Sequence, residues 1–348
     1  MAYSTITKPS LYMNTKLYTG NGGTQSISGV GFQPDWLWIK SRGSTGNHRA
    51  HDVVRGVDKQ LYPNLTNEEY TYSPNTGVTS FDSDGFSLGS DIGQNTNNET
   101  YVSWNWKAGG TGSANTDGSI NSTVSVNTTA GFSISKFTGT GANATVGHGL
   151  GAVPGFYIVK GINKVHDWRI YHKSLGATKS MEINENSAVN TTIGNWNNTE
   201  PTSSVFNLGT FTAVNENGKN YIAYCFAEKA GYSKFGKYTG NGSAEGPFVY
   251  TGFKPAWVLT KRTDATGNWH IFDNKRPTTN PTDKVLNTNT NAAESDEGQG
   301  FDFHSNGFKI RESGNFVNAG SSPFIYVAFA QEPIVANIGT NGIPTTAK

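Results

Sequence analysis

Hydrophobic residues in this chain fall in short runs of about four to eight positions, bounded by Gly, Pro, Asn and Asp. Runs of that length between turn-forming residues predict β-strands rather than helices. One run follows a proline and reads Trp36-Leu37-Trp38-Ile39-Lys40. Because successive strand residues point to opposite faces, Trp36 and Trp38 share one face and Leu37 lies on the other. Apolar residues on both faces predict a strand that is covered on both sides.

This pattern occurs in three copies, in which five elements follow one another in the same order. Each copy has a Thr-Gly-x-Gly element, a proline-led strand ending in lysine, a segment that begins eight residues after that lysine, a turn flanked by phenylalanines and a closing apolar strand. The Thr-Gly-x-Gly element lies at 19–22, 138–141 and 239–242, and the proline-led strand at 32–40, 153–160 and 253–261. The segment after the lysine lies at 48–52, 168–172 and 269–273, and the phenylalanine-flanked turn at 81–86, 206–211 and 303–308. The closing strand lies at 101–104, 221–224 and 326–329. Self-similarity of this kind predicts an internal repeat.

The repeat predicts an all-β protein of three tandem antiparallel β-sandwich units, jelly-roll or lectin-like, of about 100 residues each. The expected organisation is an N-terminal arm (1–15), three units (16–110, 131–230 and 231–332) and a C-terminal tail (333–348). Residues 111–130, rich in Gly, Ser, Thr and Asn, are interpreted as a flexible linker. Since the second and third units meet without a linker, they are expected to form one rigid piece, and the first unit to be more independent.

Composition supports the β prediction and excludes several classes of function. The chain has 37 Asn and 40 Thr but only 11 Leu, which favours turns and strands over helices. Charged residues make up 15%, and the net charge is +1, so no basic surface for nucleic acid is expected. The single cysteine, Cys225, excludes an internal disulfide and a cysteine-based zinc site.

No run approaches the 18 or so apolar residues of a membrane-spanning helix, so no membrane partner is expected. Residues 1–10 lack the charged and apolar regions of a secretory signal. The chain is therefore expected to be made in a cytoplasm and not secreted.

Histidines are the first candidates for catalysis, and two of them, His51 and His166, precede an aspartate. Adjacent strand residues point to opposite faces, so neither pair is expected to meet. The position of His51 is Tyr171 and Phe272 in the other copies, and that of His48 is Trp168 and Trp269, which indicates space-filling roles. The seven histidines are His48, His51, His148, His166, His172, His270 and His304.

Other candidate chemistry is weaker. Asp82 and Asp84 resemble the start of a calcium loop, but the later ligands of that pattern are absent, so a turn is favoured. The Gly139–Gly141 segment lacks the lysine of a phosphate-binding loop, and Cys225 is interpreted as a small buried side chain. No catalytic, cofactor-binding or metal-binding residue is predicted. Trp196, in a loop of Gly and Asn, is the best candidate for an exposed aromatic that stacks on a sugar, with core packing as the alternative.

Three features together resemble virion structural proteins of tailed phages of marine bacteria, and the resemblance spans nearly the whole chain. These are Tyr-Thr-Gly-Asn-Gly at 18–22 and 238–242, Phe-x-Pro-x-Trp at 32–36 and 253–257, and Trp-Asn-Trp-Lys-Ala-Gly-Gly at 104–110. The resemblance implies sandwich units on a phage head or tail, without catalytic residues, and a homo-oligomer.

The functional hypothesis is a non-enzymatic virion protein that decorates the capsid surface, without a cofactor, and holds the major capsid protein or other virion proteins by multivalent contacts. Its terminal segments are expected to make those contacts, with the first unit and its arm nearest the shell. The alternative is a tail-fibre or receptor-binding protein that recognises host glycans through loop aromatics. A polysaccharide-degrading enzyme would need a cleft with paired carboxylates, and the three copies share no acidic pair.

Overall fold

The computed structural model describes residues 4–191, 194–338 and 341–344. About 44% of the chain is strand and 3% is helix, and every pairing between its named strands is antiparallel, which confirms the all-β prediction. The helices in the described residues are single turns: η1 (Pro9–Leu11), α1 (Ile92–Asn95) and α2 (Thr212–Asn215).

Three large sheets form the body of the molecule, each built mainly from one of the segments that we call unit 1 (16–110), unit 2 (131–230) and unit 3 (231–332). In strand order the first sheet is β1 (Met13–Thr19), β9 (Thr100–Trp106), β3 (Trp36–Ser41), β4 (Arg49–Asp52), β5 (Gly56–Leu61) and β6 (Tyr70–Thr71). The second is β10 (Ser113–Asn115), β11 (Ser122–Asn127), β12 (Phe132–Thr138), β18 (Asn220–Phe226), β14 (Phe156–Gly161), β15 (Arg169–His172) and β16 (Met181–Glu182). The third is β19 (Ser233–Thr239), β26 (Pro323–Pro333), β21 (Phe253–Arg262), β22 (His270–Asp273), β23 (Thr282–Asn287), β24 (Ser295–His304), β25 (Gly307–Ile310) and β20 (Phe248–Tyr250).

Five consecutive strands follow the same order in each sheet: β1-β9-β3-β4-β5, β12-β18-β14-β15-β16 and β19-β26-β21-β22-β23. In each set the proline-led strand pairs with the closing strand on one side and with a four-residue strand on the other. Smaller strands cover the outer faces of units 1 and 2: β2 (Gln25–Ser28), β8 (Gly85–Leu88) and β7 (Val78–Asp82), and β13 (Ala144–Gly147) with β17 (Val205–Leu208). In unit 3, β20, β25 and β24 take this place within the large sheet. Each unit thus has sandwich character.

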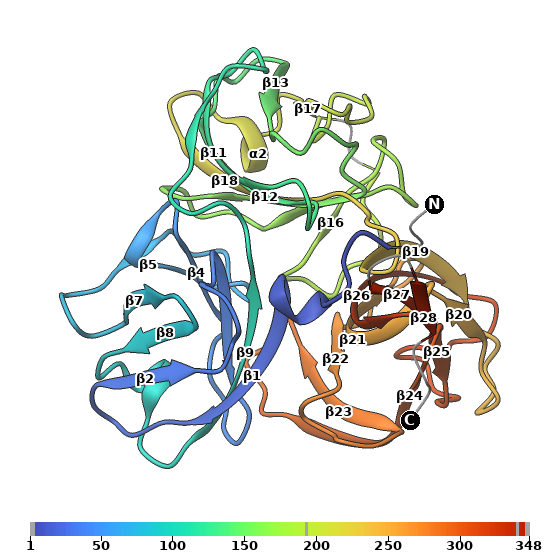
Figure 1. The fold of residues 1–348 in the computed structure, drawn as a ribbon. Helices are drawn as coiled ribbons and strands as arrows, with labels where there is room; N and C mark the ends of the chain where they lie inside the picture. The colour runs from blue at the N-terminus through green and yellow to red at the C-terminus, as the bar shows by residue number, and fades with distance from the viewer. Residues whose placement is uncertain (1–3, 192–193, 339–340, 345–348) are drawn as a thin grey trace.

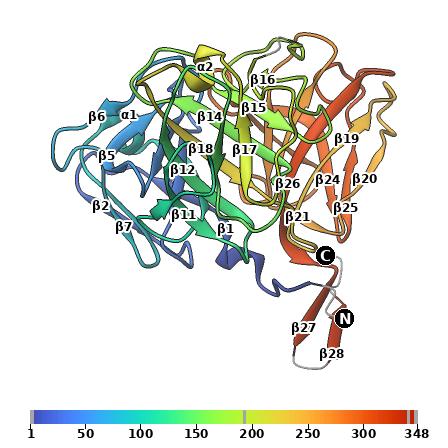
Figure 2. The same cartoon turned by 90° about the horizontal axis from the view of Figure 1, so that it is seen from above.

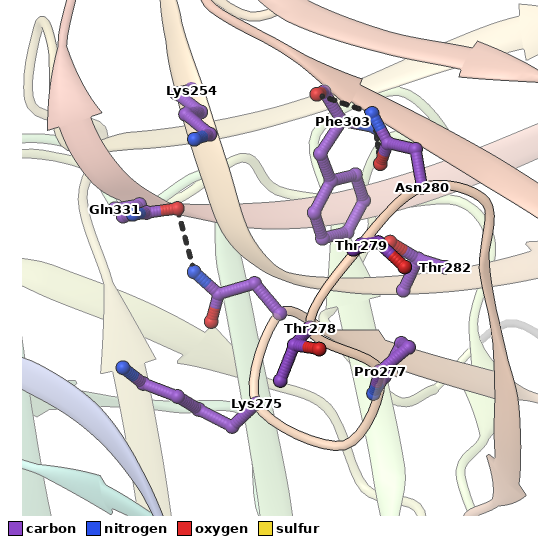
Figure 3. A pocket seen from close by; sticks show the side chains of 10 residues that line it. Lys254, Lys275, Pro277, Thr278, Thr279, Asn280, Thr282, Phe303 and Gln331 are labelled. Carbon is purple, nitrogen blue, oxygen red and sulfur yellow. Dashed lines mark hydrogen bonds between the residues drawn. The ribbon is translucent and has the colours of Figure 1, made fainter. Parts of the chain in front are cut away.

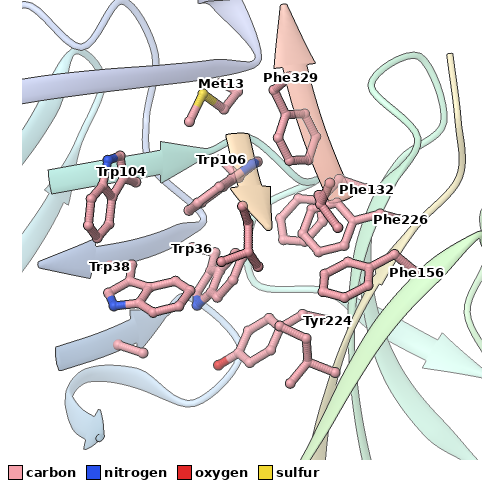
Figure 4. Packing of buried hydrophobic residues seen from close by; sticks show 14 of the residues in the cluster. Met13, Trp36, Trp38, Trp104, Trp106, Phe132, Phe156, Tyr224, Phe226 and Phe329 are labelled. Atoms are coloured by element: carbon pink, nitrogen blue, oxygen red, sulfur yellow. The ribbon is translucent and has the colours of Figure 1, made fainter. Parts of the chain in front are cut away.

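Figure 1 shows the three units as three lobes around a common centre. One face of every large sheet points to that centre, where the aromatic side chains of all three units form a single core (Figure 4). Trp36 of unit 1 stacks on Trp106 of its own unit and on Tyr224 of unit 2, both with ring centroids 4.5 Å apart. Trp106 in turn meets Trp257 of unit 3 edge to face at 5.6 Å. Such pairs add about 0.5–1.5 kcal/mol each to the gain from burying their area.

The opposite face of each large sheet packs on a smaller core of its own unit. Leu37, Tyr157 and Val258, the middle residues of the three proline-led strands, belong to these outer cores, whereas Trp36, Phe156 and Trp257 belong to the central one. The two apolar faces of this strand therefore serve two different cores.

Register corrects one part of the sequence comparison. Trp36, Phe156 and Trp257 lie opposite Trp106, Phe226 and Phe329, respectively. In the third closing strand Phe324 therefore takes the place of Tyr101 and Tyr221, two residues before the Tyr326 that the sequence pattern matched to them. A shift of two residues keeps every side chain on the same face, so the alternation of apolar residues does not reveal it.

Residues 111–130 are not a free linker. They contain β10 and β11, and β11 pairs along its whole length with β12, from Ser122 opposite Phe137 to Asn127 opposite Phe132. The Ser and Thr residues that suggested flexibility instead occupy a ladder at the edge of the second sheet. Small β-branched and hydroxyl side chains suit such a strand as well as they suit a coil.

Two backbone hydrogen bonds in equivalent positions join each pair of units, so the expected independence of unit 1 is wrong. The loop after β5, β16 or β23 of one unit reaches the loop after the proline-led strand of the next. The bonds run from Glu69 N to Ile162 O and from His166 N to Thr66 O, from Val189 N to Thr263 O and from Gly267 N to Asn186 O, and from Glu294 N to Arg42 O and from Gly46 N to Asn291 O. The three units therefore form a closed ring.

The terminal segments lie beside each other. The Ser4 hydroxyl donates to Ala230 O at 3.1 Å, and Ile6 is buried in the central core, so the described part of the arm packs on its own chain. Strands β27 (Val335–Ile338) and β28 (Asn341–Pro344) form a hairpin that projects from the body on the side where the N-terminus lies (Figure 2). Residues 1–3 of the arm and 339–340 and 345–348 of the tail are outside the described residues.

A buried asparagine explains the Thr-Gly-x-Gly element. Asn95, Asn215 and Asn318 each lie five residues before the first residue of the closing strand and are fully buried. The Oδ1 of each accepts from the backbone N–H between the two glycines of its own unit, at 2.8–3.0 Å. A Cβ on the first glycine would lie 2.2–2.4 Å from a backbone oxygen, and the second glycine has φ between +67° and +74°. The glycines are therefore structural.

Candidate functional site

The most elaborate polar constellation of the molecule lies where the three units meet. Asp52 accepts from the Arg55 Nε at 2.5 Å and from the hydroxyl of Tyr224, in unit 2, at 2.7 Å. Asp273 occupies the same strand position in unit 3. It accepts from the Arg276 Nε at 2.6 Å and from the indole of Trp104, in unit 1, at 3.1 Å.

Unit 2 has a neutral side chain instead of an aspartate at this strand position. Its equivalent of Asp52 is His172, whose Nε2 lies 3.1 Å from the carbonyl of Tyr326 in unit 3. The third closing strand has Val327 in the place of Trp104 and Tyr224, so it offers no side-chain donor to a carboxylate. The arginine is missing from unit 2 as well, because Leu175 stands where unit 1 has Arg55. The charged pair thus occurs only where the neighbouring unit supplies a donor.

A second set of ring nitrogens crosses the junctions in the other direction. The Nε1 of Trp168 donates to Tyr62 O of unit 1 at 3.0 Å, and that of Trp269 donates to Glu182 O of unit 2 at 2.8 Å. His48 takes this place in unit 1, with its Nε2 2.9 Å from Asn287 O of unit 3. The sequence comparison interpreted these residues as filling space. The structure adds that each ring nitrogen bonds a carbonyl of the preceding unit.

The lysine that ends each proline-led strand is buried. The Lys160 ammonium donates to three loop carbonyls, those of Thr66, Lys164 and His166. Lys40 and Lys261 donate to the carbonyls of Ser41 and Arg262. Burial lowers the pKa of Lys160 to about 7 and those of Lys40 and Lys261 to about 8. These ammonium groups hold loop backbone in place.

His51 and Asp52 have separate partners. The ring nitrogens of His51 lie 3.0 Å from Lys59 O and 3.1 Å from Gln94 Oε1, away from the Asp52 carboxylate. Burial, with nearby arginines, lowers the pKa of His51 to about 3. The enclosed, neutral imidazole, with its ring nitrogens placed against Lys59 and Gln94, has a structural role here. His148 and His270 are also buried, and burial lowers the pKa of each.

His166 and Asp167 do meet, contrary to the prediction from strand alternation. They precede β15 and lie in a loop, where the His166 Nδ1 is 3.6 Å from the Asp167 carboxylate. Asp167 also accepts from Asn184 at 2.9 Å and lies 3.3 Å from Arg169. The neighbouring His166 ring, together with the Asn184 amide and the Arg169 charge, lowers the pKa of Asp167 to about 2.

This loop lines an acidic pocket of about 430 Å³, together with Glu182 and the exposed Glu185. Arg169 forms ion pairs with both Asp167 and Glu182, so two of the three carboxylates are held by one buried guanidinium. Units 1 and 3 have Asn47 and Asn268 in the place of Asp167, each bonded to a side chain equivalent to Asn184. The loop geometry therefore needs no carboxylate here.

Trp196 is not exposed, so the predicted stacking site is wrong. Its side chain is 1% accessible and packs edge to face on Tyr157 at 4.9 Å in the core of unit 2. Its indole donates to Lys179 O. Polar neighbours in the sequence suggested an exposed loop, but this loop folds inward over the outer face of its sheet. Cys225 is buried as expected, and burial raises the pKa of its thiol.

The aspartates of the turn 81–86 hold backbone and hydroxyl groups. Asp84 accepts from the N–H groups of Gly29 and Gly31, and Asp82 accepts from Ser80 and Ser87. Within the described residues, no group of three or more His, Cys, Asp or Glu side chains is placed to hold a metal ion. In the same part of the chain, no helix has the length and apolar character needed to cross a membrane.

Exposed aromatics gather on unit 3, where the sequence did not single them out. Phe248 and Tyr250 lie on the same face of β20 and are 46% and 55% exposed. The equivalent outward positions are Ser26 and Ser28 in unit 1, and Thr145 and Gly147 in unit 2. The fold thus needs only small residues at these places. Comparison of the three units could have revealed this difference from the sequence.

A family model described as Domain of unknown function (DUF7483) matches residues 8–333. The chain belongs to this family. Its matched segment covers η1 and the three units and ends where β26 ends, so the β27–β28 hairpin lies beyond it. No curated protein matches the chain.

Proposed function

We propose that this protein is a non-enzymatic structural component of a phage virion that decorates the capsid surface. The observation that carries the proposal is the use of its polar side chains. The polar side chains at one equivalent position of the three units, Asp52, His172 and Asp273, bond to neighbouring units rather than line an open cleft. The assignment to a phage particle rests on the resemblance of the sequence to virion proteins of tailed phages.

The ring supports an attachment role because it presents three similar units on one rigid body. The β27–β28 hairpin is paired only with itself among the described strands and lies next to the start of the chain. We place the contact with the major capsid protein on this side, in place of the first unit and its arm, since the described arm packs on its own chain.

The test is to locate the chain on purified particles of the phage that encodes it. Cryo-electron microscopy is expected to show many copies on the head, one for each repeated shell position. A chain ending at Pro333 is expected to keep its melting temperature but to bind particles more weakly. Few copies at the tail tip would contradict the proposal, as would undiminished particle binding by the shortened chain.

A receptor-binding protein for host glycans is the second candidate, favoured by the exposed pair Phe248 and Tyr250. Aromatic faces exposed on an edge strand can stack on sugar rings. In this case the double substitution Phe248→Ser and Tyr250→Ser, which copies Ser26 and Ser28 of unit 1, is expected to reduce adsorption of the phage to its host at least tenfold. For a decoration protein, adsorption stays unchanged while the protein is still found on the head.

A further inference from the structure

A pocket of about 490 Å³ opens on unit 3 between the start of β21, the end of β26 and the loop 274–281 (Figure 3). Lys254 from β21 and Lys275 from the loop both line it, and no acidic residue does. Neither ammonium group forms an ion pair with any residue that the structure describes. The pocket therefore carries two positive charges without a counter-charge of its own.

The other units show that the fold does not require these lysines. Lys254 lies three residues before Trp257, and the equivalent positions are Gln33 and Val153. Lys275 lies two residues after Asp273, and its equivalents are Val54 and Ser174. Four uncharged residues at four equivalent positions indicate that both charges belong to this pocket and not to the architecture.

Unit 2 has the same loop length but neutralises its charge. There Lys173 forms an ion pair with Glu228 at 2.6 Å. Their equivalents in unit 3 are Asn274 and Gln331, whose amides bond each other at 2.7 Å. Unit 3 thus has two neutral amides where unit 2 has an ion pair. Lys254 and Lys275 line the same pocket as these amides.

The remaining lining favours a polyhydroxylated ligand over a simple anion. Thr278 and Thr279 add hydroxyls from the loop, and the ring of Phe303 supplies an apolar wall (Figure 3). A volume of about 490 Å³ is in the range of small-ligand sites, and is far larger than a phosphate ion needs.

We propose that this pocket binds a carboxylated sugar, such as the uronate or sialate residue of an acidic polysaccharide. The carboxylate pairs with Lys254 and Lys275, and the ring hydroxyls bond to Thr278 and Thr279. Charge-assisted bonds to a carboxylate are about twice as strong as neutral ones, so the two lysines set the preference for an acidic sugar. This site goes beyond an attachment role, because it needs no contact with a capsid.

The full chain is titrated by calorimetry and by saturation-transfer NMR with sodium galacturonate and with N-acetylneuraminate. Methyl galactoside and inorganic phosphate are the comparison ligands. We expect saturable binding of at least one acidic sugar, about tenfold tighter than that of methyl galactoside. Binding of neither acidic sugar overturns the proposal, and so does equal binding of phosphate, which would indicate an anion site without sugar recognition.

Variants assign the binding to the pocket. The double substitution Lys254→Gln and Lys275→Ser uses residues that units 1 and 2 have at these positions, so the fold is expected to keep its melting temperature. It should weaken the acidic sugar at least tenfold. Lys237→Gln, on the exposed face of β19, is the matched control and should bind like the original chain. Equal loss in both variants, or no loss in the double variant, contradicts the assignment.

Discussion

Replacement of Asp273 by alanine is expected to lower the free energy of unfolding by about 3–5 kcal/mol, measured by chemical denaturation. The side chains of Asp273 and Arg276 are both fully buried and bonded at 2.6 Å. Loss of the carboxylate leaves the guanidinium without its closest counter-charge and the indole of Trp104 without its acceptor. Because that indole belongs to unit 1, the loss also loosens the junction between units 3 and 1.

The exposed ion pair of Arg262 and Asp264 is the matched control, since Asp264→Ala should cost no more than about 1 kcal/mol. The double substitution Asp273→His and Arg276→Leu copies the solution of unit 2 and removes both charges together. It is expected to recover a substantial part of the stability lost in Asp273→Ala. An Asp273→Ala protein as stable as Asp264→Ala would show that the buried pair does not hold the ring.

Acidification is expected to unfold the protein as the pH falls below about 5. Burial lowers the pKa of His48, His51 and His270 to about 3 and that of His172 to about 4. In the unfolded chain histidine has a pKa near 6.5, so between these values the unfolded state binds more protons and is favoured as the pH falls. At pH 5 each of the four histidines costs about 2 kcal/mol, and their sum is comparable with the whole stability of many domains.

The measurement is the free energy of unfolding by denaturant at steps from pH 7.5 to pH 4.5, with return to pH 7 to show reversibility. His51→Phe, which copies Phe272 of unit 3, should reduce the slope in this range by the equivalent of one proton. Stability that does not change between pH 7 and pH 5 would contradict the burial of these imidazoles. A His51→Phe slope equal to that of the original chain would contradict the contribution of this histidine.

The sequence by itself determined the class of structure and its main strands. Alternating apolar residues with Gly, Asn and Thr between them predicted an all-β chain, and Trp36 with Leu37 on opposite faces predicted a strand covered on both sides. These signals are local, because side-chain alternation and turn chemistry depend on neighbouring residues. The same locality explains the error of two residues in the third closing strand, where both alignments place apolar residues on the same face.

Tertiary structure decided the rest, and the reason is that it joins residues distant in the chain. Nothing near Trp196 in the sequence shows that its loop folds inward, and nothing near residues 111–130 shows that β12 provides a partner strand. Unit 1 has Asp52 where unit 2 has His172, and the reason lies in the closing strand of the next unit. That strand offers the hydroxyl of Tyr224 to Asp52 but a backbone carbonyl to His172. The three similar units are visible in the sequence, but the ring that they form depends on hydrogen bonds between buried donors and acceptors of different units.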